Sequence, residues 1–112
     1  PYATASGLNQ NLRSFSDINF PNSKNDLYSM FIERNTLLSI KSGLVGMITM
    51  QSWMYLKTFQ NLREMILKKT CMISLLHLGP NAFPEIQGER VQVATYIFEN
   101  LVPTSPIVGK KS

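Results

Sequence analysis

The sequence predicts an α/β layer fold in which two helices and three strands follow one another along a short chain. Two segments repeat apolar residues at helical spacing, and three short runs have the apolar character of strands. The connection between the last two runs, residues 79–90, is too short for a parallel crossover through a helix. The last two strands are therefore expected to be antiparallel, which is an unusual ending for an α/β sheet.

The first element expected is a helix over residues 24–41. Residues 1–22 before it show neither a helical nor a strand period and are expected to form a loop. Ser23 and Asp26 resemble a capping box at the start of the helix, and Gly43 suits the left-handed stop after it. The inward face comprises the apolar residues near a 3.6-residue period: Leu27, Met30, Phe31, Leu37 and Leu38.

The next elements are a strand and a second helix. The run Leu44–Met50 (LVGMITM) is almost purely apolar, which suits a strand buried on both faces. A turn over residues 51–57 leads to a helix over residues 58–69, with Thr58 as its cap. The inward face of this helix is expected to comprise Phe59, Leu62, Ile66 and Leu67.

Two further strands complete the expected fold. Residues 71–78 (CMISLLHL) form an apolar run that ends at a Gly-Pro-Asn break, and residues 91–98 (VQVATYIF) alternate more clearly. Residues 102–112 are interrupted by prolines and basic, and are expected to form a flexible tail.

Composition excludes several classes of protein. The chain has 112 residues, a hydrophobic fraction of 44% and a charged fraction of 16%, which exclude a disordered chain. Cys71 is the only cysteine, so a disulfide scaffold is excluded, and a small core residue is the expected role. The most apolar stretch, residues 40–50, is too short to span a membrane. The net charge of +4 fits a nucleic-acid partner only weakly, because the basic residues are scattered.

The strand order resembles the C-terminal half of a class I S-adenosylmethionine-dependent methyltransferase. In that Rossmann-like sheet the seventh strand is inserted antiparallel between the fifth and sixth. The dipeptide Pro1-Tyr2 resembles the end of the Asn-Pro-Pro-Tyr signature of amino-methylating DNA methyltransferases. Four further segments resemble later parts of adenine-N6 enzymes: residues 26–34 (DLYSMFIER), 46–54 (GMITMQSWM), 59–64 (FQNLRE), and 77–83 (HLGPNAF) with 88–92 (GERVQ).

Together, residues 1–100 are similar to the large adenine-specific methyltransferase subunit of the BREX or Pgl phage-defence systems. The resemblance implies that residues 1–101 are part of a catalytic domain, with 1–22 as the loop after the signature and 23–101 as the α/β part. The implied reaction moves a methyl group from S-adenosylmethionine to the N6 amine of an adenine flipped out of double-stranded DNA. The implied setting is the bacterial cytoplasm, in a restriction-modification or phage-defence system.

The resemblance also implies the roles of three aromatic residues. Pro1 and Tyr2, as part of the signature, are the catalytic candidates, and Tyr2 would hold one face of the flipped base. Phe83 would lie against the other face, the alternative being a loop residue tucked into the core. Phe31 would pack beside the adenine ring of the cofactor or continue the inward face of its helix, and both interpretations predict burial.

Other residues carry weaker expectations. Trp53 follows the carboxyl end of a strand and is a candidate for the edge of the pocket, although a core position is commoner. Arg13, Lys24 and Lys57 are candidates for contacts with DNA phosphates, the alternative being solvated surface charge. His77 is the single histidine and is expected to be structural, and no metal site is expected because no ligand spacing is present.

The main cofactor-binding half of the fold, with its glycine-rich turn and ribose-binding acid, is expected to be missing. The six glycines make no GxGxxG pattern, so the chain alone is expected to be inactive. An apolar sheet edge or face would then be exposed, and pairing with a second copy would cover it. Two alternatives stay open: a non-catalytic nucleic-acid-binding α/β module, and an RNA or protein methyltransferase on the same fold.

Overall fold

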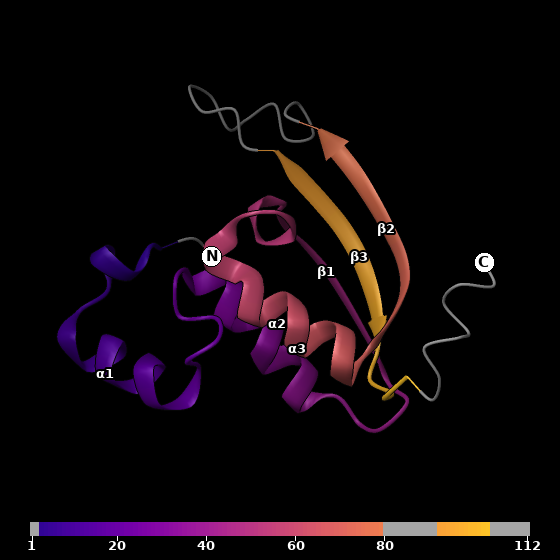
Figure 1. The fold of residues 1–112 in the computed structure, drawn as a ribbon, viewed down its shortest axis with the longest axis horizontal. Helices are drawn as coiled ribbons and strands as arrows, with labels where there is room; N and C mark the ends of the chain where they lie inside the picture. Colours follow the sequence, from indigo (N-terminus) through magenta and orange to yellow (C-terminus); the bar gives the residue numbers. More distant parts are fainter. Residues whose placement is uncertain (1–2, 80–91, 104–112) are drawn as a thin grey trace.

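A computed structural model describes residues 3–79 and 92–103 (Figure 1). The strands β1 (Leu44–Met50), β2 (Cys71–Gly79) and β3 (Val93–Glu99) form one sheet, and α2 (Leu27–Leu38) and α3 (Gln60–Lys69) cover one of its faces. Short 3-10 turns lie at Ala5–Gly7, Ser52–Met54 and Lys57–Phe59. A further helix, α1 (Gln10–Asn19), lies beyond α2, away from the sheet.

The sheet confirms the expected antiparallel ending. Its order is β1-β3-β2, and β3 runs antiparallel to both neighbours, from Met50 opposite Val93 to Leu44 opposite Glu99 on the β1 side. The two outer strands are therefore parallel to each other, with β3, the last strand among the described residues, inserted between them. Their carboxyl ends meet at one edge of the sheet, which we call the carboxyl edge.

The core lies between this sheet and the two covering helices. The alternate residues Ala94, Tyr96 and Phe98 of β3 are fully buried against it. The ring of Trp53 packs edge-on against Tyr96, with ring centroids 5.2 Å apart. Tyr28 and Ile32 from α2, Val45 from β1, and Phe59, Leu62 and Ile66 at α3 complete the cluster. Three of the four residues expected on the inward face of the second helix are thus confirmed.

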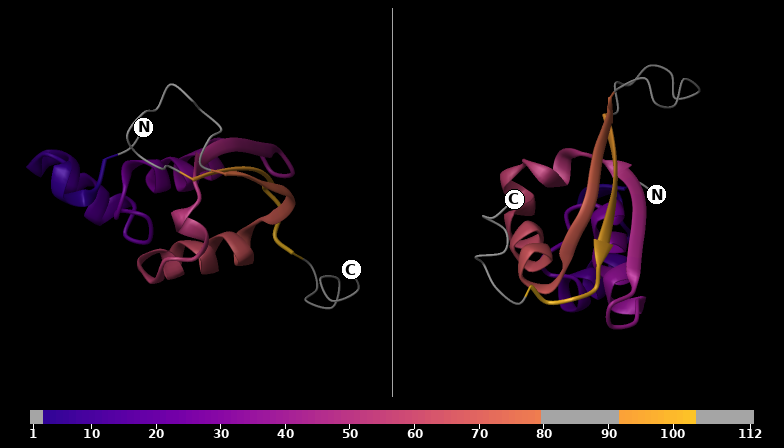
Figure 2. Two further views of the ribbon diagram at one scale, coloured as in Figure 1. Left: turned by 90° about the horizontal axis from the view of Figure 1, so that it is seen from above. Right: turned by 90° about the vertical axis from the view of Figure 1, so that its right-hand side faces the viewer.

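The opposite face of the sheet is bare within the described part of the chain. Leu44 and Ile48 of β1 are 64% and 54% exposed, so the expectation of a strand buried on both faces is wrong. The reason is that α2 and α3 cover the same face of the sheet, so the other face has no helix packed on it among the described residues. Figure 2 shows β2 and β3 reaching beyond the helices at the carboxyl edge, and apolar residues along β2 are exposed: Met72, Ile73, Leu75, Leu76 and Leu78.

The helix α1 corrects the expected loop over residues 1–22. The side chain of Asn9 accepts a hydrogen bond from the amide of Leu12 at 2.8 Å and so caps the helix. Leu12 and Phe15 face α2, and the ring of Phe15 lies 5.9 Å from that of Phe20. A polar composition thus concealed a short amphipathic helix, and the described part of the chain has three α-helices instead of two.

The helix α2 is shorter than the expected span of residues 24–41. Asp26 is its N-cap, because its side chain accepts from the amide of Tyr28, whereas the Ser23 hydroxyl donates to Glu33. Leu37 and Leu38, expected to face inward, are 65% and 63% exposed.

The ends of the helices differ from expectation for local steric reasons. Ser42, with φ of 64°, takes the left-handed conformation expected at Gly43. Gly43 is favoured for another reason, since a Cβ there would lie only 3.0 Å from the carbonyl oxygen of Ile40. Thr58 does not cap α3, which instead follows directly from a 3-10 turn, and Leu67 is 69% exposed.

Candidate functional site

The carboxyl edge gathers polar side chains from three strands. Gln51, directly after β1, donates from Nε2 to Oε1 of Gln92, just before β3, at 2.5 Å. Its own Oε1 lies 2.9 Å from Nδ1 of His77, near the end of β2. Ligands of open α/β sheets bind where strands end in this way. The Gln51 side chain thus links both neighbours of β3 at the edge where a site is expected.

The chain segment after Tyr2 is attached to the start of α2. The amide of Ala3 donates to Oδ1 of Asp26 at 3.1 Å, and the amide of Leu27 donates to the carbonyl oxygen of Ala3 at 2.8 Å. The amide of Ala5 also donates to the carbonyl oxygen of Asn25 at 3.1 Å. These bonds hold residues 3–5 against the N-terminus of α2.

Tyr28 connects the N-terminus of α2 to the end of β1. Its hydroxyl lies 2.7 Å from the hydroxyl of Ser52, and the residue is 2% exposed. Burial raises the pKa of Tyr28 to about 12, with a smaller contribution from the nearby Asp26 carboxylate. Tyr28 therefore keeps its proton at neutral pH.

The catalytic candidates Pro1 and Tyr2 and the base-contact candidate Phe83 lie outside the described residues. Their roles stay predictions. Their nearest described neighbours are Ala3, tied to Asp26, and Gly79 and Gln92, which end β2 and precede β3. The segment that carries Phe83 thus joins the described chain at the carboxyl edge, and the segment that carries Tyr2 joins it at the N-terminus of α2.

Phe31 lies in an apolar groove between α1 and α2. It is 40% exposed, whereas both sequence interpretations expected burial, because it faces α1 instead of the sheet. The groove has a volume of about 350 Å³ and is lined by Leu12, Phe15, Phe20, Leu27, Met30, Phe31 and Arg34. Aromatic walls suit a purine ring.

This groove does not by itself fit a whole S-adenosylmethionine molecule. Among the described residues that line it, Arg34 is the only charged one, and none of them supplies a carboxylate of the kind that commonly binds ribose hydroxyls. The described lining residues thus offer an apolar surface for a ring and few polar partners.

Trp53 lies in the core and not in this groove. It is 3% exposed, and its carbonyl oxygen accepts from Nη1 of Arg63 at 2.9 Å. The indole Nε1 atom is buried without a hydrogen-bond partner among the described residues. The structure therefore places Trp53 in the position that is commoner for a large aromatic residue in a turn.

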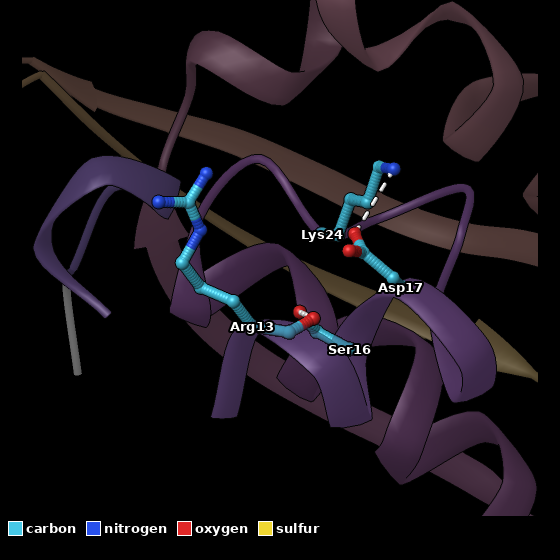
Figure 3. Close-up of polar contacts among 4 residues, drawn as sticks. All are labelled: Arg13, Ser16, Asp17 and Lys24. Carbon is cyan, nitrogen blue, oxygen red and sulfur yellow. Dashed lines mark hydrogen bonds and ion pairs between the residues drawn. The ribbon is translucent and has the colours of Figure 1, made fainter. Parts of the chain in front are cut away.

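The three phosphate-contact candidates differ in their surroundings. Lys24 Nζ lies 3.1 Å from Oδ1 of Asp17, which offsets its charge (Figure 3). The guanidinium of Arg13 points away from that pair, and the carbonyl oxygen of Arg13 accepts from Ser16 Oγ at 2.9 Å. Lys57 is exposed in the 3-10 turn before α3.

Two kinds of site have no counterpart in the described ranges. No group of three acidic, histidine or cysteine side chains there could hold a metal ion. None of the helices found there is both long enough and apolar enough for a membrane span. Cys71 is half-buried, and its thiol lies 3.4 Å from the carbonyl oxygen of Leu101.

Sequence reasoning missed two parts of the carboxyl edge. The bonds among Gln51, His77 and Gln92 join residues up to 41 positions apart, so no local pattern could indicate them. Asp26 was assigned to a capping box but not to the bond with Ala3. An acid just before an apolar helical run was the available signal.

Comparison with known proteins identifies the family. The model of the Eco57I restriction-modification methylase family matches residues 1–83. The chain is 37% identical over 100 residues to the adenine-specific methyltransferase BrxX of Escherichia coli O9:H4 (strain HS). It is 36% identical over 99 residues to the adenine-specific methyltransferase PglX of Lacticaseibacillus casei (strain Zhang). These matches cover 89% and 88% of this chain but 8% of each relative. The chain belongs to the Eco57I restriction-modification methylase family.

Proposed function

We propose that this chain is part of a bacterial DNA methyltransferase that moves a methyl group from S-adenosylmethionine to the N6 amine of adenine, in a phage-defence system. The observation that carries the proposal is the match of residues 1–83 to the methylase family. The two relatives, both named adenine-specific methyltransferases, give the target base. In this proposal β1, β2 and β3 correspond to the fifth, sixth and seventh strands of the catalytic sheet.

The geometry of the carboxyl edge supports the proposed chemistry. An enzyme that methylates an exocyclic amine must take the base out of the stack and hold it by its faces. The segment that carries Phe83 joins the described chain at this edge, beside Gln51, and the segment that carries Tyr2 joins it at Asp26, before the helix that Tyr28 links to the end of β1. We assign the two faces of the base to Tyr2 and Phe83, with Pro1 completing the signature.

The groove between α1 and α2 supports a role for Phe31 in cofactor binding. Its aromatic lining, with Phe15 and Phe20 beside Phe31, offers a surface for the adenine ring. S-adenosylmethionine supplies the methyl group when bound. The residues of this chain would orient the purine end and keep water from it, while the partners for the polar parts come from elsewhere in the enzyme.

DNA is the proposed macromolecular partner. Arg13 and Lys57 would each neutralise a phosphate and so position the duplex without reading its sequence. Neither side chain has an acidic partner among the ion pairs of the described residues, whereas Lys24 has Asp17.

The test is methylation of DNA by the full-length enzyme. Purified enzyme, duplex DNA and S-adenosylmethionine are incubated, and modified nucleosides are identified by mass spectrometry. We expect N6-methyladenine in DNA, and none when the cofactor is omitted. Methylated RNA or methylated protein without methylated DNA would favour the same fold with another substrate, and DNA binding without any methylation would favour a binding module.

A second measurement tests whether the chain binds the cofactor without the rest of the enzyme. Calorimetric titration of the 112-residue chain with S-adenosylmethionine is expected to give no binding in the micromolar range. Stoichiometric binding in that range would show that the groove lined by Phe31 holds more of the cofactor than its side chains indicate.

A further inference from the structure

Asp26 carries more bonds than a helix cap requires. Its Oδ1 atom accepts from the amide of Tyr28 at 3.2 Å, which is the capping bond, and also from the amide of Ala3 at 3.1 Å. Asp26 is 8% exposed, so its bond to Tyr28 is buried and its bond to Ala3 partly buried. A single buried oxygen thus joins the start of α2 to the residue that follows Tyr2.

The surrounding backbone makes this connection a short antiparallel bridge. Thr4 pairs with Asp26, the amide of Leu27 donates to Ala3, and the amide of Ala5 donates to Asn25. The side chain of Asn25 in turn donates from Nδ2 to the carbonyl oxygen of Thr58 at 2.7 Å. Residues 3–5 are therefore anchored through 25–27 to the turn before α3.

We propose that Asp26 is a positioning residue, which fixes the backbone at Ala3 and thereby the point from which Tyr2 reaches the target base. The proposal rests on the proposed function for its catalytic consequence. Catalysis depends on placement within fractions of an ångström, so a loosened anchor lowers the rate of the chemical step.

Three variants separate anchoring from capping. Asp26→Asn keeps an oxygen at the same distance from the backbone and retains both bonds. Asp26→Ser keeps a good helix cap. The serine side chain is shorter by one covalent bond, so its hydroxyl oxygen no longer reaches the amide of Ala3. Thr70→Val is the matched control, because it removes the buried bond from Thr70 Oγ1 to Ile66 at 2.7 Å, at the opposite edge of the sheet.

The experiment measures single-turnover methylation and amide hydrogen exchange in the full-length enzyme. We expect Asp26→Ser to lower the methylation rate constant about 10- to 100-fold and to speed exchange at Ala3 and Ala5. Asp26→Asn is expected to stay within about threefold of the wild type, and Thr70→Val to lower thermal stability without either effect.

The results that would overturn the positioning role of Asp26 differ from those that would overturn the proposed function. Equal rates for Asp26→Ser and the wild type, or equal losses for Asp26→Ser and Thr70→Val, would overturn the positioning role while the methyltransferase assignment stands. An absence of adenine methylation by the wild type would overturn the proposed function instead. The exchange rates at Ala3 and Ala5 would then still decide whether Asp26 anchors this segment.

Discussion

The hydroxyl oxygens of Tyr28 and Ser52 lie 2.7 Å apart, although the residues belong to the first turn of α2 and to the turn after β1. Tyr28 also packs against Phe59, with ring centroids 5.9 Å apart. One side chain thus joins the N-terminus of α2, the end of β1 and the turn before α3. Its protonation state affects all three.

Tyr28 predicts a loss of stability at high pH. Its pKa is raised to about 12 in the folded chain from the ordinary tyrosine value of 10.0, so the folded state binds the proton more tightly. Its contribution is complete below pH 10 and is lost as the pH rises through 12. Over this interval the wild type should lose about 1–2 kcal/mol more than Tyr28→Phe, after allowance for solvent screening.

Urea unfolding of the chain between these pH values measures the difference. At neutral pH, Tyr28→Phe should itself cost about 1 kcal/mol through the lost bond to Ser52. Tyr55→Phe is the matched control, because Tyr55 is 61% exposed. Parallel pH profiles for the wild type and Tyr28→Phe would show that the hydroxyl of Tyr28 is hydrated in solution.

Phe31→Ala should weaken binding of S-adenosylmethionine by the full-length enzyme about tenfold, which corresponds to the loss of one aromatic contact. Leu37→Ala is the control, since Leu37 is an exposed apolar residue of the same helix that does not line the groove. Calorimetry or the KM for the cofactor measures the effect. Identical affinities for the two variants would remove Phe31 from the cofactor site.

Phe83→Ala should lower methylation about 10- to 100-fold, because stacking of a base on an aromatic side chain contributes about 1–3 kcal/mol. Phe83→Trp should restore most of the activity, since it keeps an aromatic face. Thermal melting of both variants checks the fold. A marked fall in the melting temperature of Phe83→Ala would favour the alternative in which Phe83 is a core residue.

Arg13→Ala should reduce the slope of log Kd against log salt concentration for duplex DNA by about 1, as expected for one lost phosphate contact. Lys24→Ala should change the slope less, because Lys24 already pairs with Asp17. Fluorescence anisotropy over a range of salt concentrations measures both. A larger change for Lys24→Ala would mean that the ion pair opens on DNA and that Lys24 makes the contact.

The sequence predicted the strands better than the helices. The bounds of β1 follow from an unbroken apolar run, and the reversal of β3 follows from the length of a connection. Just after the end of α2 at Leu38, the carbonyl oxygen of Ser39 accepts from Nδ2 of Asn100, beyond β3, at 3.1 Å. A contact between residues 61 positions apart leaves no local pattern in the chain.

The same distinction applies to the candidate site, where some features follow from a single residue and others depend on contacts with distant parts of the chain. The interpretation of Trp53 as a core residue depends on size and apolar character, which are properties of the residue itself. The exposure of Phe31 depends on α1, a helix that the polar composition of residues 10–19 concealed. The anchoring of Ala3 depends on Oδ1 of Asp26 accepting from Ala3 and from Tyr28 at the same time, and the backbone on both sides sets that geometry.

The position of β3 has a consequence for synthesis on the ribosome. The central strand of the sheet is the last to be translated, so β1 and β2 emerge before either has its partner. Pairing across a large sequence separation is slow, and unpaired strands with apolar side chains are the segments that aggregate. Until Glu99 has left the exit tunnel, β1 and β2 therefore lack the strand that pairs with both of them.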